Sequence, residues 1–475
     1  MTDSPRAQLP IDPDERPIEG QLQQIRNQLE LLKQDKSCYV KSGDVIKLYK
    51  ATIEQVKALN ELRQRKDKKD EQNRVDILCD DCFQLISLGF MAIGKNNDAP
   101  GIYSIISSIK RLLDHLNEAA FYSAKDLESI SRELQKHRAS LKRCQAEYDP
   151  ELIELIERRM AVCETALARL QAVIDHLGPE HIVTWEKLVS ILRRLSNLNT
   201  RSRYSKEEHS ALKKELEDLE TACPSLHKEL PESIAARYEQ IILEQEDALK
   251  LSPEKLVTNL YERCVLWSWM IEQKPLYVDE DFRELYTTLK TIRDQLESRS
   301  LLQAWSLRET DLYDYQRRLD RIDGARTVDG NFVDAKGKKA CLQTQRTLLY
   351  FLRKSYALIY YMLTQSEPVS EALLPIYNQL KTLKKCLREV QKAGGVSSPR
   401  ELYPYSMKLN SIDNMQVDGK FMVNGDIPDG QAAVVSLLHE CYELTQQLKE
   451  QAEENEEAEE SGSAVPVQAA VPSTA

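Results

Sequence analysis

The sequence predicts an all-α protein, a helical bundle or repeat array of about four helical units with short hairpin loops in its C-terminal half. Three observations lead to this prediction. Leu, Glu, Lys, Gln and Arg fill long runs that are interrupted by only 15 Gly and 18 Pro among 475 residues, a composition that favours helices. Apolar residues recur at spacings of three and four. One sequence pattern also occurs twice, which is typical of repeat proteins.

The apolar spacing predicts helices along nearly the whole chain, with boundaries accurate to a few residues. The predicted segments are 19–35, 43–67, 72–94, 100–120, 124–147, 150–177, 180–199, 205–222, 232–248, 253–272, 280–300, 302–323, 340–365, 369–392, 398–413 and 430–450.

The duplicated pattern begins as Leu-Tyr-x-Tyr-x-x-x-Leu-x-x-Ile-Asp, once at Leu312 and again 90 residues later at Leu402. Val-Asp-Gly-x-Phe follows in both copies and ends at Phe332 and Phe421. Because Asp-Gly is a favoured two-residue turn, we expect a short hairpin between helices, with each Phe filling the core. The alternative is a loop over a groove that contributes Asp329 or Asp418.

Weaker sequence similarities elsewhere in the chain extend the predicted repeat to about four units. A Ser followed by an acidic residue three positions later, the spacing of a capping box, occurs at Ser123, Ser205 and Ser398. Ser306 has the same spacing but lies out of register with the pattern at Leu312. Only the second copy carries a proline within its predicted helix, Pro404, which we expect to kink that helix.

Composition divides the chain into four regions. Residues 1–17 contain four prolines and no periodicity, and residues 451–475 are acidic and then rich in Ser, Ala, Pro and Val, so both are predicted to be disordered. Between them we expect an N-terminal helical region, 18–250, with two units, and a C-terminal helical region, 251–450, with the two units that carry the duplicated pattern.

The charge and cysteine content narrow the function classes. The net charge is −11, but seven glutamates between Glu450 and Glu460 leave −4 for the rest of the chain. This balance argues against a nucleic-acid partner, which needs a concentrated basic face. The ten cysteines are scattered singly, and we find neither an N-terminal signal segment nor a membrane-spanning run. We therefore expect reduced thiols, no membrane association and a location in the cytoplasm and nucleus.

No motif predicts catalytic, cofactor-binding or metal-ligating residues. Cys79 and Cys82 have the spacing of half a zinc site, but no second pair lies nearby, so a buried pair is the better interpretation. The sequence contains no HExxH, no Gly-rich phosphate loop and no GxSxG. Ser196 follows Arg193 and Arg194, as in sites for basophilic kinases, although neighbouring leucines belong to an apolar stripe.

The segment 351–431 resembles a known family. Its stretches Phe-Leu-Arg-Lys-Ser-Tyr-Ala-Leu-Ile-Tyr (351–360), Ser-Glu-Pro-Val-Ser-Glu-Ala-Leu-Leu-Pro-Ile-Tyr-Asn-Gln-Leu (366–380) and the run from Gly394 to Met415 are similar to uncharacterised fungal proteins grouped under a domain of unknown function. The resemblance implies a fungal protein of cytoplasm and nucleus with no assigned activity. It supplies no catalytic or binding residues.

These observations favour a non-catalytic interaction, scaffold or regulatory protein that binds protein partners and uses no cofactor. The alternative is an enzyme or small-ligand binder with a site between the last two helical units. A third, weaker interpretation is recognition of phosphate-rich ligands by Arg353, Lys354, Lys381, Lys384 and Lys385. The candidate interaction residues lie mainly in the second copy and on the aromatic helix before it: Tyr403, Tyr405, Lys408, Asp413, Asn414, Asp418, Arg400, Arg353 and Lys354.

Overall fold

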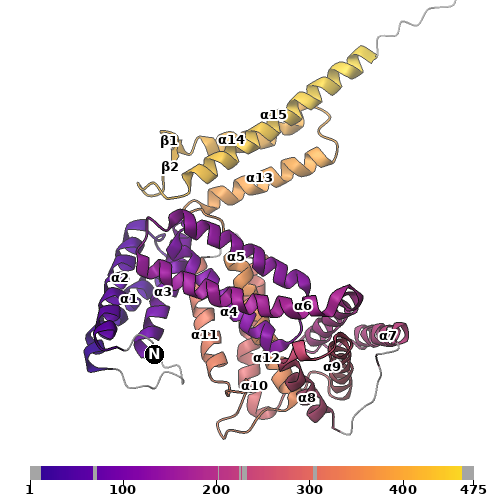
Figure 1. Cartoon of the computed structure of the whole chain (residues 1–475). Helices are drawn as coiled ribbons and strands as arrows, with labels where there is room; N and C mark the ends of the chain where they lie inside the picture. The colour runs from indigo at the N-terminus through magenta and orange to yellow at the C-terminus, as the bar shows by residue number, and fades with distance from the viewer. Residues whose placement is uncertain are drawn as a thin grey trace, which may run out of the picture. The chain divides into compact units, whose positions relative to one another are not determined.

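The computed structural model describes residues 12–67, 72–201, 203–223, 226, 233–302 and 308–462. The described residues form fifteen α-helices, and the only sheet that they contain is a two-stranded hairpin (Figure 1). The predicted all-α class is therefore confirmed.

Most of the helices follow the predicted segments closely, but the helix predicted from residue 302 begins at Leu312. They are α1 (Arg16–Gln34), α2 (Ser42–Arg65), α3 (Arg74–Ala92), α4 (Ala99–Ala119), α5 (Ala124–Cys144), α6 (Pro150–Leu198), α7 (Lys206–Ala222), α8 (Ile234–Glu246), α9 (Pro253–Gln273), α10 (Arg283–Leu302), α11 (Leu312–Gly324), α12 (Leu342–Thr364), α13 (Leu374–Lys392), α14 (Tyr403–Asp413) and α15 (Gln431–Gly462). The hairpin strands are β1 (Gln416–Val417) and β2 (Lys420–Phe421). Short 3-10 helices are η1 (Pro13–Glu15), η2 (Ala248–Lys250), η3 (Glu280–Phe282), η4 (Glu309–Asp311) and η5 (Pro399–Leu402).

Local sequence signals explain several helix ends. Ser123 and Asp126 form the complete predicted capping box at the start of α5. Ser205 caps α7 by accepting from the Glu208 backbone N–H. Ser398 instead caps the 3-10 helix η5, through the N–H of Arg400. The two helices predicted on either side of residues 178–179 are joined in α6, where Gly178 has a φ of 65° and interrupts the helical geometry.

The chain forms two compact units. Unit 1 contains residues 1–35, 45–90 and 96–366, and unit 2 contains residues 36–44, 91–95 and 367–475. The predicted boundary at residues 250 and 251 therefore lies inside unit 1. Unit 2 is assembled from three separate pieces of chain, an arrangement that local periodicity does not reveal.

Unit 1 is built around α4, α6, α9 and α12. Helix α6 packs against α4, α5, α7 and α9, and α12 packs against α4, α10 and α11. Trp185, Tyr103 and Trp267 are among its largest fully buried side chains. Removing these aromatic surfaces from water supplies much of the driving force for packing.

Both ends of the described chain differ from the predicted disorder. Residues 13–17 are helical, and Glu15 is buried, with its carboxylate accepting from Arg63 Nε at 2.8 Å and from Asn73 Nδ2 at 2.7 Å. These contacts anchor the start of the chain. At the other end α15 continues to Gly462, so the acidic run extends a helix. Residues 1–11 and 463–475 lie outside the described residues.

Unit 2 packs α13 and α14 against α15 over a continuous apolar core that includes Leu380, Leu409 and Phe421. Two short pieces from earlier in the chain complete it. Tyr39 donates its hydroxyl proton to the Val423 carbonyl at 2.7 Å, and the Glu371 N–H donates to the Ala92 carbonyl at 2.8 Å.

The two copies of the duplicated pattern form equivalent local structures. In each, a short 3-10 helix leads into an α-helix, η4 into α11 and η5 into α14, and a turn then delivers a buried Phe. Gln345 accepts from the Phe332 N–H at 2.9 Å and donates to the Phe332 carbonyl at 2.7 Å. Gln431 makes the same two bonds with Phe421, at 2.9 and 2.8 Å. We call each such arrangement a Phe–Gln clamp.

The predicted hairpin is confirmed in the second copy only. Asp418 and Gly419 both have positive φ, 51° and 72°, as the tight turn between β1 and β2 requires. The first copy forms a loop in which only Gly330 of the Asp-Gly pair has positive φ, 74°. In both copies the prediction that the Phe fills the core is confirmed, with Phe332 and Phe421 4% and 1% exposed.

The predicted kink at Pro404 is wrong. Helix α14 begins at Tyr403, so Pro404 lies in its first turn. A proline there removes no intrahelical hydrogen bond and its fixed φ suits the helix start. The residues expected to form the first turn of this helix form η5 instead. The α-helix therefore starts at Tyr403, and Pro404 lies at a position where proline is favoured.

Candidate functional site

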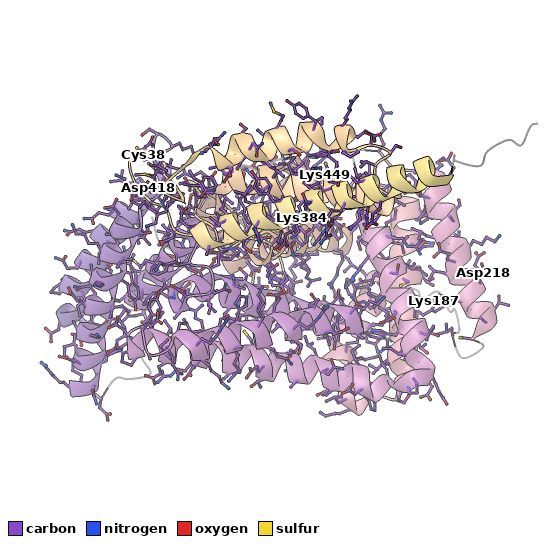
Figure 2. The ribbon with its side chains drawn as sticks, turned by 90° about the horizontal axis from the view of Figure 1, so that it is seen from above. Cys38, Lys187, Asp218, Lys384, Asp418 and Lys449 are labelled. Atoms are coloured by element: carbon purple, nitrogen blue, oxygen red, sulfur yellow. The ribbon has the colours of Figure 1, made fainter. Side chains whose placement is uncertain are left out.

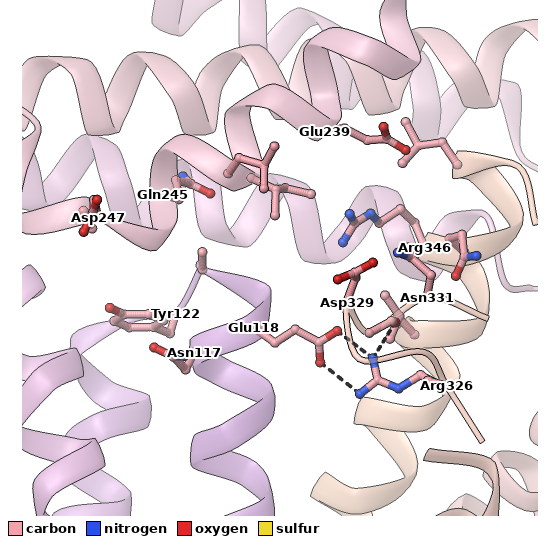
Figure 3. Close-up of a pocket in the computed structure, with 18 of the residues that line it drawn as sticks. Asn117, Glu118, Tyr122, Glu239, Gln245, Asp247, Arg326, Asp329, Asn331 and Arg346 are labelled. Carbon is pink, nitrogen blue, oxygen red and sulfur yellow. Dashed lines mark hydrogen bonds and ion pairs between the residues drawn. The ribbon is translucent and has the colours of Figure 1, made fainter. Parts of the chain in front are cut away.

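The first copy of the duplicated pattern borders a large polar cavity in unit 1 (Figure 3). Its volume is about 1030 Å³. The walls come from the end of α4, from α6, α8 and α12, and from the loop that contains Asp329 and Asn331. The size suits a small organic molecule.

Glu118 and Arg326 form an ion pair at the base of this cavity. Arg326 Nη1 lies 2.6 Å from Glu118 Oε1 and also donates to the Gly330 carbonyl at 2.8 Å, so it holds the loop onto α4. Burial by itself would raise the pKa of Glu118, but hydrogen bonding to His115 and the charges of Arg353 and Arg326 bring it well below its usual value. The Glu118 carboxylate is therefore ionised.

The same ion pair separates the large cavity from a second one of about 560 Å³, since Glu118 and Arg326 line both. The second cavity is bordered by α3, α4, α6 and α11 and contains a dense cluster of ion pairs. We call it the acid cluster. Its main members are Asp80, Asp81, Arg111, Arg159, Arg317 and Asp320.

Each aspartate of the acid cluster has a defined arginine partner. Arg159 Nη2 lies 2.6 Å from Asp80, which also accepts from Tyr103 at 2.5 Å. Arg317 Nη1 lies 2.6 Å from Asp81. Although burial opposes ionisation of Asp80, the Arg159 charge and the Tyr103 hydrogen bond lower its pKa. These pairs tie α3 to α6 and to α11 of the first copy.

Around Asp320 the cluster continues toward α4 and α12. Arg111 Nη2 lies 2.9 Å from Asp320, and Tyr356 donates its hydroxyl proton to the same carboxylate at 2.9 Å. Asp323, the last residue of the first Leu-Tyr-x-Tyr pattern, faces His115 and Arg326. The equivalent Asp413 of the second copy is exposed and accepts from Gln416 at 2.8 Å.

The sequence interpretation of residues 79–82 missed these aspartates because it concentrated on the cysteines. Cys79 and Cys82 are buried or half-buried on α3, and burial raises the pKa of the Cys79 thiol to about 12. The two residues between them, Asp80 and Asp81, carry the ion pairs. Two adjacent acidic residues inside an apolar helical segment were the available signal. In the described part of the chain no group of three potential ligands is placed to hold a metal ion.

The raised pKa of Asp81 leads us to expect that the stability of the protein depends on pH. Burial raises its pKa to about 7, from 3.8 in an unfolded chain, despite the Arg317 charge that favours ionisation. The folded protein therefore holds a proton that the unfolded chain releases, and the free energy of unfolding falls as pH rises from about 4 to about 7. The slope from one group is at most about 1.4 kcal/mol per pH unit.

In an Asp81→Asn variant this contribution disappears. We expect the stability of the variant relative to wild type to increase with pH across that window, when both are followed by urea unfolding. A stability difference that stays constant from pH 4 to pH 8 would show that Asp81 is ionised in the folded protein throughout.

The predicted interaction residues are divided between the two units. Arg353 and Lys354 are half-buried on α12 in unit 1, with Arg353 Nη2 3.4 Å from Glu118. The others belong to unit 2, where all except Tyr405 are exposed: Arg400, Tyr403, Lys408, Asp413, Asn414 and Asp418. Tyr405 packs against the core of unit 2. Figure 2 shows Asp418 at the hairpin end of that unit, away from Lys384 and Lys449 on its long helices.

The phosphate-binding set suggested by the sequence is not assembled in either unit. Arg353 and Lys354 belong to unit 1, whereas the three lysines belong to unit 2. Lys381 lies 2.8 Å from Glu367, and Lys384 pairs with Glu440. Two of the three lysines are therefore already neutralised by carboxylates of their own unit.

The enzyme alternative required Asp329 or Asp418 to face a Tyr or His in a closed pocket. Asp418 is exposed at the tip of the hairpin, and Asp329 borders the large cavity. Within the described residues, no hydrogen bond or ion pair joins either carboxylate to a Tyr or His. The two copies of the pattern also belong to different units.

The second copy instead presents apolar side chains to solvent. On α14, Tyr403 and Met407 lie one turn apart and are 66% and 53% exposed. In the hairpin, Val417 pairs with Lys420 on the face opposite Phe421. Met415 and Met422, which flank the two strands, are 52% and 42% exposed. We call these five side chains, Tyr403, Met407, Met415, Val417 and Met422, the outer face.

Together the fold and these sites define an all-α protein with cavities bordered by charged side chains in one unit and exposed apolar side chains on the other. None of the described helices has both the length and the apolar character that a membrane span requires. No solved protein structure matches the chain.

The chain belongs to the CUB1 family of fungal proteins. It is 33% identical over 462 residues to the CUB1 family protein C30C2.08 of Schizosaccharomyces pombe, covering 96% of this chain and 97% of that protein. It is 32% identical over 511 aligned positions to the Cu(2+) suppressing and bleomycin sensitive protein 1 of Saccharomyces cerevisiae, covering 94% of this chain and 91% of that protein. Neither name specifies a reaction.

A family described as Protein of unknown function (DUF2408) matches residues 174–309. The predicted resemblance to a fungal family with a domain of unknown function is therefore confirmed, although the matched domain precedes the segment 351–431 that suggested it. Residues 174–309 include the second half of α6 and helices α7 to α10, which contribute the α8 wall of the large cavity.

Proposed function

We propose that this protein is a non-catalytic interaction or scaffold protein whose outer face binds an amphipathic segment of a partner protein. The observation that carries the proposal is the exposure of five large apolar side chains between Tyr403 and Met422, each 42% to 66% exposed. Methionine is favoured at binding surfaces because its flexible, polarisable side chain adapts to different partners.

The charges beside the outer face favour a protein over a lipid surface or a nucleic acid. Two lysines, Lys408 and Lys420, and two aspartates, Asp413 and Asp418, lie in the same segment, and all four are exposed. Anionic membranes and nucleic acids both select uniformly basic surfaces. A surface with apolar anchors and both signs of charge suits a peptide or helix that has the same mixture.

The rigid support of the outer face fits this role. On the opposite side of the hairpin, Phe421 is buried and clamped by Gln431, and Leu409 and Ile412 bury the inner side of α14. Because a rigid surface loses little conformational entropy on binding, it binds a partner more tightly than a mobile loop would. Arg400, Asn414 and the exposed rim residues would supply polar contacts.

A location in both cytoplasm and nucleus is part of the proposal, and imaging of a fluorescently tagged chain would test it. The proposal includes phosphorylation at Ser196, which follows Arg193 and Arg194, and tryptic phosphopeptide mapping would test it. The Ser196 hydroxyl donates to the Leu192 carbonyl at 2.8 Å, so a kinase would have to break this bond.

Affinity purification tests the outer face directly. A tagged full-length chain is compared with Met407→Glu and Val417→Glu, which place a charge among the apolar anchors. We expect a partner bound by wild type to bind either variant at least about tenfold more weakly when the purified components are mixed, because interface hot spots contribute about 2 kcal/mol or more.

Val183→Glu is the matched control, since Val183 is 58% exposed on α6 of unit 1. It should bind the partner as wild type does. Equal binding by Met407→Glu and Val417→Glu, with both variants folded by circular dichroism, would overturn the proposed role of the outer face.

A further inference from the structure

The wall of the large cavity contains charged side chains of both signs, and several arginines lie in or close to it. Arg346 borders the cavity from α12, and Arg263 of α9 and Arg353 of α12 lie close enough to Arg346 for their charges to interact with it. Among the described residues, Arg263 donates to neutral groups: Gln245 Oε1 at 2.7 Å and the Ala119 and Ala120 carbonyls at 3.0 and 3.4 Å. Arg353 Nη2 lies 3.4 Å from Glu118 Oε2, and the same carboxylate forms the ion pair with Arg326.

Among the described residues, Arg346 has no hydrogen-bond or ion-pair partner. Its Nε is buried without an acceptor, and its guanidinium contacts the Tyr238 ring, 5.1 Å from the centroid. Burial and the nearby Arg263 charge lower the pKa of Arg346, yet a guanidinium remains charged at neutral pH. Glu118 and Glu239 favour the charged form of Arg346 but form no ion pair with it, so a bound anion would supply the direct partner that this half-buried guanidinium lacks among the described residues.

We propose that the large cavity binds a phosphate-bearing small molecule, with the guanidinium of Arg346 donating to the phosphate. The planar guanidinium can donate two parallel hydrogen bonds to one phosphate group. This site is separate from the outer face and does not depend on the proposed function.

The rest of the cavity indicates that the ligand has an organic body as well. Leu243, Leu249 and Val328 all border the cavity and are 64%, 51% and 98% exposed. These apolar side chains would contact the part of the ligand that extends from the phosphate. A nucleoside phosphate has the required combination of charge, apolar ring surface and size.

Asp329 modulates the site. Figure 3 shows its side chain directed into the cavity near Arg346, but the two do not form an ion pair. Its negative charge would repel a bound phosphate and so limit affinity. Replacing this carboxylate by an uncharged amide should therefore strengthen binding, whereas loss of Arg346 should weaken it.

The test uses isothermal titration calorimetry and thermal unfolding of the full chain with ATP, adenosine and inorganic pyrophosphate. We expect ATP to bind and to raise the melting temperature, and adenosine to bind far more weakly. If pyrophosphate binds and ATP does not, the ligand is a phosphate compound without an organic body. If ATP binds and pyrophosphate does not, the organic body is required for binding. Absence of binding by both phosphate compounds overturns the proposal.

Variants then assign the site. Arg346→Gln should weaken binding about tenfold or more, and Arg65→Gln, at an exposed arginine of α2, should bind as wild type does. Unchanged affinity in Arg346→Gln overturns the assignment. If Arg346→Gln does not fold, Asp329→Asn decides, because the exposed loop tolerates it: tighter binding supports the site, and equal or weaker binding contradicts it.

Discussion

Phe421→Ala should destabilise unit 2 by about 3–5 kcal/mol, a large part of the stability of a domain of this size. The Phe421 ring is 1% exposed in the core formed by α13, α14 and α15, and truncation leaves a cavity there. It also loosens the Phe–Gln clamp that fixes the turn of the hairpin. Urea unfolding, followed by hydrogen exchange of the α13 and α15 amides, would measure the loss.

Val417→Ala is the control for that experiment. Val417 lies on the opposite side of the same hairpin and is 53% exposed. Its truncation should change stability by no more than about 0.5 kcal/mol. Similar effects of the two substitutions would mean that the hairpin does not bury Phe421 in solution.

Gly94→Ala should be nearly as damaging, with an expected loss of about 2–5 kcal/mol. Gly94 has a φ of +84°, and an added Cβ would lie 2.7 Å from the Ser370 nitrogen and 2.9 Å from the Val369 carbonyl carbon. The left-handed backbone costs an alanine about 1–2 kcal/mol and the overlap about 1–3 kcal/mol more. The contact joins residues 91–95 to the start of the main segment of unit 2.

Gly20→Ala provides a control of opposite sign. Gly20 lies inside α1, and an added Cβ would meet nothing within 4 Å. Alanine there should stabilise the protein by about 0.5–1 kcal/mol. If Gly94→Ala were as stable as wild type, residues 91–95 would not pack against Val369 and Ser370.

Most of the helical fold could be predicted from the sequence because helices depend on local spacing. The helix starts at Ser123 and Ser205 followed from capping chemistry, and the break near Gly178 followed from glycine and proline. Pro404 was misinterpreted because the pattern gave no sign that a 3-10 helix would precede α14. A shift of one turn in the helix start reverses the effect of a proline.

Long-range organisation was harder to predict. Unit 2 recruits residues 36–44 and 91–95 from far earlier in the chain, and no periodic signal marks such pieces. The Phe–Gln clamps were missed because the glutamine follows its Phe by 13 residues in one copy and by 10 in the other. An alignment with fixed gaps does not detect a partner whose spacing changes.

The candidate sites show the same division between local and distant contacts. The exposed residues of the second copy, including Tyr403 and Asp418, were identified from the pattern itself. The acid cluster was not, because Asp80 meets Arg159 from 79 residues away. Ion pairs between distant segments depend on the tertiary fold. The sequence signal for this cluster was the pair of adjacent aspartates, Asp80 and Asp81, in an apolar helix.

The central claim is that the second copy of the duplicated pattern binds a partner protein through its outer face. Hydrogen–deuterium exchange of the full chain, with and without a purified partner, tests it most directly. We expect new protection in residues 403–422, with the amides of α4 and α12 around the large cavity unchanged. Protection confined to unit 1, with residues 403–422 exchanging as in the free protein, would contradict the claim.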